Sequence, residues 1–263
     1  MSKRVIAWAL GAALAACGTA AERNDTADGN PRAVPVVPVA RGDSAREIYI
    51  DSVEPGNPLV VRGRARTFEN TVQVLARDTA GAAIVETFET SVGEMGNHNP
   101  FEARVWLVRD PGSRVTVEAF EYSANDGSVR SLVSRAVPMP AARSRVTVLF
   151  PTTDCTTLKA FERTVPRSVG VAQLLAHMLV AGPTETEKAA GATSPFPAGS
   201  RVRSVALRDG VVTVDFNERL QNVGGSCAAQ AIRAAVSSTL ARLPGVTRVV
   251  ITAGGSESLA LQP

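Results

Sequence analysis

The sequence predicts an all-β sandwich followed by an α+β domain, and three observations support this fold class. Apolar and polar residues alternate between about 46 and 138, which is typical of strands with one solvent-facing side. After a proline pair near residue 140, apolar residues recur at spacings of three and four, as on the buried face of a helix. Composition agrees, because 21 glycines and 16 prolines with only 5% aromatic residues indicate many turns and short strands.

The first residues form a predicted export signal. Lys3 and Arg4 precede an apolar run over residues 5–16, which is too short to span a bilayer, since a spanning helix needs about 20 apolar residues. The run ends in Leu-Ala-Ala followed by Cys17, a pattern that resembles the bacterial lipobox. That resemblance implies a signal peptide over residues 1–16 and a diacylglycerol thioether on Cys17 after cleavage. The alternative is an ordinary signal peptide with an incidental cysteine.

Residues 17–44 are predicted to be the lipidated cysteine and a flexible linker. Small and polar residues dominate the first half, and Pro31, Pro35 and Pro38 follow. As a coil this linker would reach roughly 30 Å. Gly18 stands where an aspartate would indicate retention in the inner membrane. We therefore expect an exported, membrane-anchored lipoprotein, on the outer membrane of a Gram-negative cell or otherwise on the outer face of the cell membrane.

The sandwich is predicted over residues 45–140. Clear alternation covers four runs, at 59–65, 71–77, 101–107 and 114–122. Turn sequences rich in Asn, Asp, Gly and Pro separate these runs. About seven short strands without a helical stretch favour two stacked antiparallel sheets.

The α+β domain is predicted over residues 141–257, with a tail at 258–263. Its expected order is strand, helix, hairpin, helix, strand, with the helices packed on one sheet. The expected elements are a strand at 146–150, a helix at 169–181, a hairpin at 202–216 with an Asp-Gly turn, a helix at 228–243 and a strand at 246–252.

Two resemblances sharpen this interpretation. The first domain resembles the immunoglobulin-like domain of bacterial spore germination proteins on the motifs Ser52-Val53-x-Pro55, Pro58-Leu59-x-Val61-x-Gly63, Pro100-Phe101-Glu102 and Asp126-Gly127-Ser128. The second resembles the GerMN domain of sporulation and germination proteins on Arg163, Gly182-Pro183-Thr184-x-x-Glu187 and Asp215. The germination lipoproteins best known for the GerMN domain carry two copies in tandem, whereas one copy follows a β-sandwich here, so a sporulation role is not carried over.

The six GerMN motif positions, Arg163, Gly182, Pro183, Thr184, Glu187 and Asp215, are candidate interaction residues with a structural alternative. Gly182-Pro183 would end the helix before it, and Thr184 with Glu187 would form a capping box. Arg163 with Arg167 and Arg203 would form a basic patch for an anionic partner, or each would be a solvated arginine.

The cysteines and histidines indicate a disulfide and no metal site. With Cys17 acylated, Cys155 and Cys227 remain, and an even pair in an exported protein favours a disulfide. A metal site would need further ligands. His177 is expected on the polar, solvated side of its helix, and His98 lies in a loop where it is a weak candidate for a ligand or base. No metal or cofactor is expected.

Charge and motifs favour binding over catalysis. The net charge is +3, and removal of the leader lowers it, so no nucleic-acid partner is expected. The sequence has no phosphate-binding Gly-Lys-Ser/Thr loop, no Gly-x-Ser-x-Gly and no Ser-x-x-Lys motif. We predict a non-catalytic envelope lipoprotein that acts as an interaction or scaffold module. Its expected partners are the lipid bilayer through acylated Cys17, other envelope proteins, and peptidoglycan or another glycan.

Two alternatives remain at this point. One is a solute- or glycan-binding lipoprotein, with the ligand in an aromatic cleft near Trp106, Phe120 and Tyr122. The other is a hydrolase that uses Asp215 or Glu187.

Overall fold

The computed structural model describes residues 47–221 and 223–261. The predicted signal peptide, Cys17 and the predicted linker to residue 44 lie outside the described residues. Within the described ranges, no helix has the length and apolar character needed to cross a membrane.

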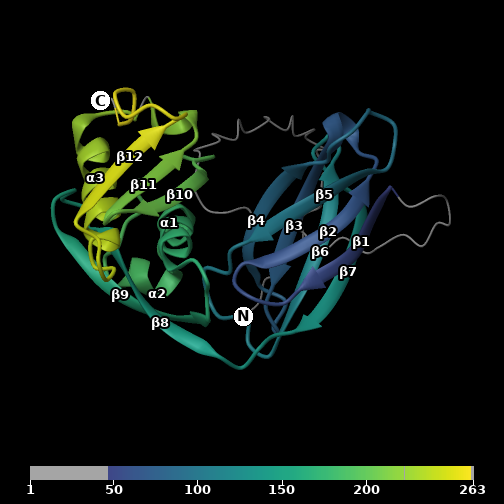
Figure 1. Cartoon of the computed structure of the whole chain (residues 1–263), viewed down its shortest axis with the longest axis horizontal. Helices are drawn as coiled ribbons and strands as arrows, with labels where there is room; N and C mark the ends of the chain where they lie inside the picture. Colours follow the sequence, from purple (N-terminus) through teal and green to yellow (C-terminus); the bar gives the residue numbers. More distant parts are fainter. Residues whose placement is uncertain (1–46, 222, 262–263) are drawn as a thin grey trace, which may run out of the picture. The chain divides into compact units, whose positions relative to one another are not determined.

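The first folded domain is an immunoglobulin-like β-sandwich, as predicted (Figure 1). Three strands form one antiparallel sheet in the order β1-β2-β5, and four form the other in the order β4-β3-β6-β7. A short 3-10 helix, η1 (Phe68–Asn70), connects β2 to β3. The strands are β1 (Ile48–Glu54), β2 (Leu59–Ala65), β3 (Thr71–Arg77), β4 (Ala83–Thr90), β5 (Asn99–Val105), β6 (Arg114–Tyr122) and β7 (Val129–Pro138).

Alternation of side chains builds the core between the two sheets. In β2, every second residue from Leu59 to Ala65 is buried, while the residues between them face outward. β5 shows the same alternation. Each valine or leucine buried in this way stabilises the fold by roughly 1.5–3 kcal/mol. Gly63 fits because of its size, since a Cβ there would lie 2.1 Å from the carbonyl oxygen of Tyr49 and 2.6 Å from the Phe101 ring.

The chain enters the sandwich at one end and leaves it at the other. Ile48 pairs with Ala65, and Ala65 pairs with Asn99, so β1 begins at the end that holds the β2–β3 and β4–β5 connections. β7 ends at Pro138, which pairs with Arg114 at the start of β6. That pair lies at the opposite end, because β6 runs toward the β2–β3 connection.

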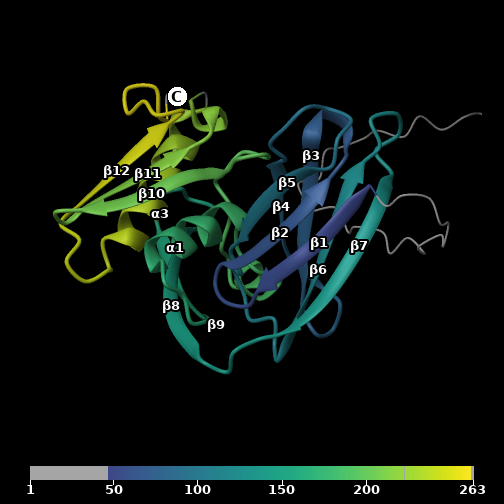
Figure 2. The same cartoon turned by 45° about the vertical axis from the view of Figure 1, so that its right-hand side comes forward.

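The second domain is α+β, as predicted, and contains two separate sheets (Figures 1 and 2). One sheet has the order β10-β11-β12, with β10 and β11 antiparallel and β11 and β12 parallel. The other is a two-stranded antiparallel pair of β8 and β9. The elements are β8 (Arg143–Pro151), β9 (Leu158–Pro166), α1 (Val171–Ala181), α2 (Glu185–Ala189), β10 (Val202–Arg208), β11 (Val211–Phe216), η2 (Glu218–Leu220), α3 (Ser226–Leu240) and β12 (Arg248–Ala253).

The two long helices contact both sheets. α3 packs against β8 and β12, and α1 packs against β10, β8 and α3. Their apolar faces supply fully buried side chains, among them Leu174, Met178 and Ile232. The parallel β11–β12 pair requires a crossover, and α3 provides it.

Three details of the prediction for the second domain were wrong. β9 was missed, because its sequence has polar residues on both sides and only its last residues are buried in alternation. The helices consequently do not pack on one sheet but contact two. The predicted second helix also extended too far, since α3 ends at Leu240, well before Gly245.

The hairpin prediction was correct in position and turn type. β10 and β11 are joined by Asp209 and Gly210, which both have positive φ, 49° and 77°. A two-residue turn with this backbone matches the right-handed twist of the flanking strands.

Candidate functional site

A buried ion pair organises the GerMN motif residues. Arg163 Nε lies 2.9 Å from Glu187 Oε1, and Arg163 Nη2 lies 2.6 Å from Glu187 Oε2. The Arg163 and Glu187 side chains are only 7% and 8% exposed. Arg163 Nη2 also donates to the carbonyl oxygen of Gly182 at 2.9 Å. The arginine thus joins β9 to the end of α1 and the start of α2.

Glu187 has a second role as part of a capping box. The Thr184 amide donates to Glu187 Oε2 at 2.7 Å, and the Glu187 amide donates to the Thr184 hydroxyl at 3.3 Å. Burial alone would raise the pKa of Glu187, but the hydrogen bonds from Arg163 and Thr184 outweigh burial and lower it. The carboxylate therefore stays ionised and fully engaged, which fits a structural role.

The end of α1 follows the predicted pattern. Gly182 has φ 81°, and its amide donates to the carbonyl oxygens of Met178 and Leu179. Pro183 follows and cannot continue the helix. The motif from Gly182 to Glu187 is thus a tight connection between two helices, stabilised by Arg163.

The predicted basic patch of Arg163, Arg167 and Arg203 does not form. Arg163 is buried against Glu187 rather than solvated, so both readings of it from the sequence were wrong. Arg203 pairs with Glu218 at 2.9 Å and lies 3.4 Å from Asp215. Sequence reasoning missed this burial because a strand with polar residues on both sides gives no signal for it.

Asp215 also makes structural contacts. Its Oδ1 accepts a hydrogen bond from the Thr252 hydroxyl at 2.7 Å and another from the Gly255 amide at 2.8 Å. These bonds connect β11 to β12 and to the turn after it. Together with the Arg203 contact they occupy the carboxylate. Arg203 thus contacts the carboxylates of both Asp215 and Glu218.

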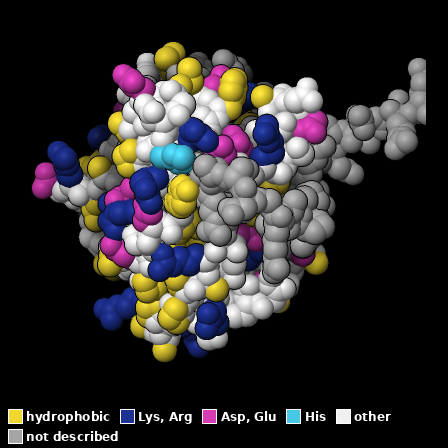
Figure 3. Space-filling view, turned by 90° about the vertical axis from the view of Figure 1, so that its right-hand side faces the viewer, with side chains coloured by type: hydrophobic (Ala, Val, Ile, Leu, Met, Phe, Trp, Pro, Cys, Tyr) yellow, Lys and Arg dark blue, Asp and Glu magenta, His cyan; other side chains and the backbone are white. Residues whose placement is uncertain are grey.

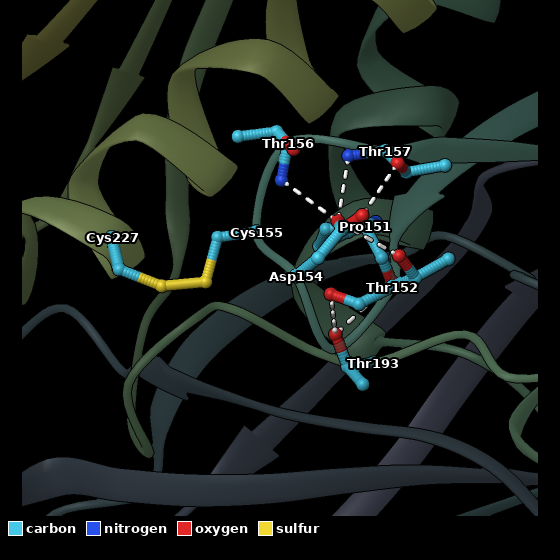
Figure 4. The surroundings of a disulfide bond; sticks show 8 residues. All are labelled: Pro151, Thr152, Asp154, Cys155, Thr156, Thr157, Thr193 and Cys227. Carbon is cyan, nitrogen blue, oxygen red and sulfur yellow. Dashed lines mark hydrogen bonds between the residues drawn. A yellow bond between two sulfur atoms is a disulfide. The ribbon is translucent and has the colours of Figure 1, made fainter.

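The predicted disulfide joins Cys155 to Cys227 (Figure 4). It connects the β8–β9 turn to the first turn of α3. Asp154 holds this turn, because its carboxylate accepts from the Thr156 amide at 3.0 Å and from the Thr157 amide at 2.8 Å. These hydrogen bonds hold the pKa of Asp154 well below its usual range, and the bond from the Thr157 hydroxyl contributes most. The Thr193 amide, in the segment after α2, donates to the Pro151 carbonyl oxygen at the end of β8 at 2.8 Å.

His177 is not solvated, contrary to the expectation from its helix face. Its ring stacks on Trp106, with centroids 5.6 Å apart and planes 16° from parallel. Burial lowers the pKa of His177 to about 4, so the imidazole is neutral at pH 7. The helix position alone could not reveal this, because the covering ring comes from a residue 71 positions earlier.

The expected aromatic cleft is not formed by the three residues that were named for it. Trp106 is buried under His177, and Phe120 is a fully buried core residue. Tyr122 packs its edge on Phe120 and donates to Glu86 at 3.0 Å. Trp106 and Phe120 are therefore closed to a sugar, and Tyr122 is 39% exposed.

His98 has an aromatic neighbour in the structure. Its ring and that of Tyr49 form a T-shaped pair with centroids 5.5 Å apart, and the Arg64 guanidinium lies over the Tyr49 ring. Within residues 47–221 and 223–261, no group of three or more His, Cys, Asp or Glu side chains could hold a metal ion.

A shallow cavity of about 280 Å³ lies where β8, α1 and α3 meet. Its lining includes the apolar side chains of Val146, Leu175 and Leu243 and the basic side chains of Arg145 and Arg242. A volume near the lower limit for small-molecule sites suits a small group rather than a whole oligosaccharide.

Sequence reasoning missed an apolar end of the sandwich. Phe68, Val92 and Met95 are 65%, 79% and 72% exposed, although large apolar side chains are usually buried. Phe68 lies in η1, and the other two lie in the β4–β5 connection. The signal in the sequence was weak, because each is a lone apolar residue among polar ones.

One face of the molecule carries charges of both signs. Figure 3 shows basic and acidic side chains beside one another on this face, with hydrophobic ones between them. The sandwich also holds ion pairs among β1, β2 and β5, such as Arg64 with Asp51 at 3.0 Å.

Both resemblances inferred from the sequence are confirmed. Residues 50–128 match the family Gmad2, described as the immunoglobulin-like domain of bacterial spore germination. Residues 144–259 match the family Germane, described as sporulation and spore germination. No curated protein matches the chain at a significant level.

Several solved structures match part of the chain. The tandem GerMN domains of the sporulation protein GerM from Bacillus subtilis are 20% identical, with a TM-score of 0.36 over 46% of this chain and 42% of that chain. The first GerMN domain of the same protein is 21% identical, with a TM-score of 0.35 over 42% and 84% of the two chains. A putative lipoprotein from Clostridium perfringens is 14% identical, with a TM-score of 0.29 over 44% and 77%. The chain therefore spans about two fifths of the tandem GerM chain.

Proposed function

We propose that the protein is an exported, lipid-anchored envelope protein that works as a non-catalytic interaction module. The predicted leader and the lipobox-like sequence ending in Cys17 support export and acylation. Its two domains match families whose descriptions name sporulation and spore germination. This supports a role in assembly at the cell envelope.

One observation carries the non-catalytic part of this proposal. The carboxylate of Glu187 accepts structural hydrogen bonds at both oxygens, and Asp215 accepts two at Oδ1 while its Oδ2 lies 3.4 Å from Arg203. A general acid or base needs a lone pair or proton that faces the substrate. The engagement of both carboxylates by their own fold supports a structural role for them over a catalytic one.

The anchoring is tested by the intact mass and location of the chain in cells of a bacterium that expresses it. We expect a mature protein that begins at Cys17, is heavier by its acyl groups and fractionates with membranes. Cys17→Ser should give no acylated species and should leave the membrane fraction. An uncut leader with an unmodified Cys17 thiol in the wild type would refute the proposal.

The scaffold role is tested by crosslinking in the same cells, followed by mass spectrometry. The acylated protein should crosslink reproducibly to a small set of envelope proteins, and Cys17→Ser should lose those crosslinks while it remains folded. Crosslinks that are equally abundant in Cys17→Ser would show that anchoring does not direct the interaction.

A second candidate function is the binding of a small anionic group, and the cavity between β8, α1 and α3 favours it. Arg145 and Arg242, which line it, form no ion pair with any described carboxylate. A carboxylate, such as that of a peptidoglycan peptide, would suit two arginines beside apolar side chains. Thermal shift with muropeptides tests this, with Arg145→Ala/Arg242→Ala as the variant that should abolish any shift.

A further inference from the structure

We propose that the end of the sandwich where the chain enters is a membrane-contacting tip, with Phe68, Val92 and Met95 inserted into the interfacial layer of a lipid bilayer. The inference rests on the proposed function, because the bilayer is the one in which an acylated Cys17 would sit. We call these three residues with their two loops the apolar tip.

The apolar tip gathers exposed hydrophobic surface that a soluble domain would ordinarily bury. Its three side chains are each exposed by 65% or more. Single exposed hydrophobic residues are common, but a group on neighbouring loops marks an interaction surface. The fold does not require apolar residues at these positions, because polar side chains could be placed on the same loop backbone.

Hydrogen bonds hold the two loops of the tip side by side. The Asn70 side chain donates to the Gly93 carbonyl at 2.9 Å, and the Ser91 amide donates to the Asn70 carbonyl at 2.8 Å. The buried Asn99 amide group donates to the Asn70 side-chain oxygen at 3.2 Å and to the Glu94 carbonyl at 2.7 Å. A rigid pair of loops presents apolar side chains without an added entropic cost on insertion.

The path of the chain points the tip at the membrane. Glu47, the first described residue, pairs with Arg66 at 2.6 Å, and Arg66 lies two residues before Phe68. The segment that follows Cys17 therefore joins the sandwich at the apolar tip, whereas the chain leaves for the second domain at Pro138, at the opposite end.

The length of that segment makes a weak insertion effective. Glu47 follows Cys17 by thirty residues, which can span at most about 100 Å when extended. Confinement near the bilayer raises the effective lipid concentration at the tip. Three apolar side chains, too few to bind a vesicle tightly by themselves, are then sufficient to orient the sandwich.

The charges near the tip indicate which lipid surface it suits. Glu69 and Glu94 are exposed within the two loops, and Arg66 is already paired with Glu47. Residues 67–70 and 91–98, all described, contain no Lys or Arg, so these two loops lack the basic cluster that would direct the tip to strongly anionic lipids. We infer a surface rich in zwitterionic lipids and use phosphatidylcholine vesicles as the probe.

The test measures insertion directly and does not depend on cellular acylation. The chain from Cys17 onward keeps every described residue, and its Cys17 thiol is coupled to a maleimide lipid while Cys155 and Cys227 remain in their disulfide. Tryptophan is placed at the tip in Phe68→Trp and, as a matched control, at the exposed Leu207 in Leu207→Trp. Vesicles with brominated acyl chains quench only tryptophans that enter the bilayer.

We expect the added tryptophan of Phe68→Trp to be quenched at least twofold more than that of Leu207→Trp, after subtraction of the Trp106 signal. Phe68→Trp with Val92→Ser and Met95→Ser should lose most of the difference. Equal quenching of the two tryptophans would overturn the proposal, as would crosslinking of position 68 to a protein partner in cells without quenching. If Cys17 proves unacylated in cells, the proposed anchoring fails, while this measurement still reports whether the tip inserts.

Discussion

Glu187 Oε2 accepts two hydrogen bonds at once, from Arg163 Nη2 at 2.6 Å and from the Thr184 amide at 2.7 Å. Arg163 belongs to β9 and Thr184 caps α2, so one carboxylate group links these two elements. They do not follow one another in the sequence, because α1 lies between them. The stability of the second domain should therefore depend strongly on this pair.

Removal of one partner should be costly. Arg163→Ala leaves the Glu187 carboxylate buried without its cation and should lower the free energy of unfolding by about 3–5 kcal/mol. Urea denaturation followed by circular dichroism at 222 nm checks this, because all described α-helices lie in the second domain. The control is Lys188→Ala, which removes an exposed pair with Glu185 and should cost under about 1 kcal/mol. Equal losses in the two variants would contradict a central role for Arg163.

The disulfide should stabilise the second domain through its long loop. Cys155 and Cys227 are 72 residues apart, so reduction or Cys155→Ala/Cys227→Ala should lower the free energy of unfolding by about 4 kcal/mol in the loop-entropy model. Urea denaturation with and without reductant measures the difference. The double variant should no longer respond to reductant, and a variant that still responded would disprove this assignment.

Stability should fall in mild acid because of His177. Burial holds its pKa at about 4 in the folded state, against about 6.5 when unfolded. Between pH 6.5 and pH 4 the unfolded state binds more protons, so the free energy of unfolding should decrease as the pH falls, by up to about 3 kcal/mol.

The matched variant for this effect is His177→Phe, which keeps a ring against Trp106 but cannot take up a proton. Unfolding measured at intervals from pH 7 to pH 4 should show a shallower decline in His177→Phe than in the wild type. Parallel declines would assign the acid sensitivity to carboxylates instead.

The core of the sandwich should not tolerate a side chain at position 63. Gly63→Ala places a Cβ 2.1 Å from the Tyr49 carbonyl oxygen, so the sheet must shift, at a cost of at least about 2 kcal/mol. Thermal unfolding followed by Trp106 fluorescence checks this. Gly224→Ala, with nothing within 4 Å of its Cβ, should change stability by less than about 1 kcal/mol.

Local patterns predicted those parts of the fold that depend on local forces. The alternation in β2 and β6, the Asp209-Gly210 turn and the Thr184–Glu187 capping box are each determined by nearby residues, and each was predicted from the sequence. β9 was missed because its stability comes from pairing with β8 rather than from an apolar pattern of its own.

The site residues were harder to predict for the same reason. The burial of Arg163 depends on Glu187 24 positions later, and that of His177 depends on Trp106. The apolar tip arises only when the β2–β3 and β4–β5 connections meet through Asn70 and Asn99. These are contacts between distant segments, which periodicity within one segment does not encode.

The opposite entry and exit of the chain have a mechanical consequence. If the chain is acylated at Cys17 as proposed, a force applied between that anchor and the second domain would pull β1 and β7 lengthwise, in opposite directions. The hydrogen bonds of β1 with β2 and of β7 with β6 run across the strands, so such a force would strain each row of them together. The strand pairing of β1 and β7 is thus arranged to resist tension applied between the entry and the exit of the sandwich.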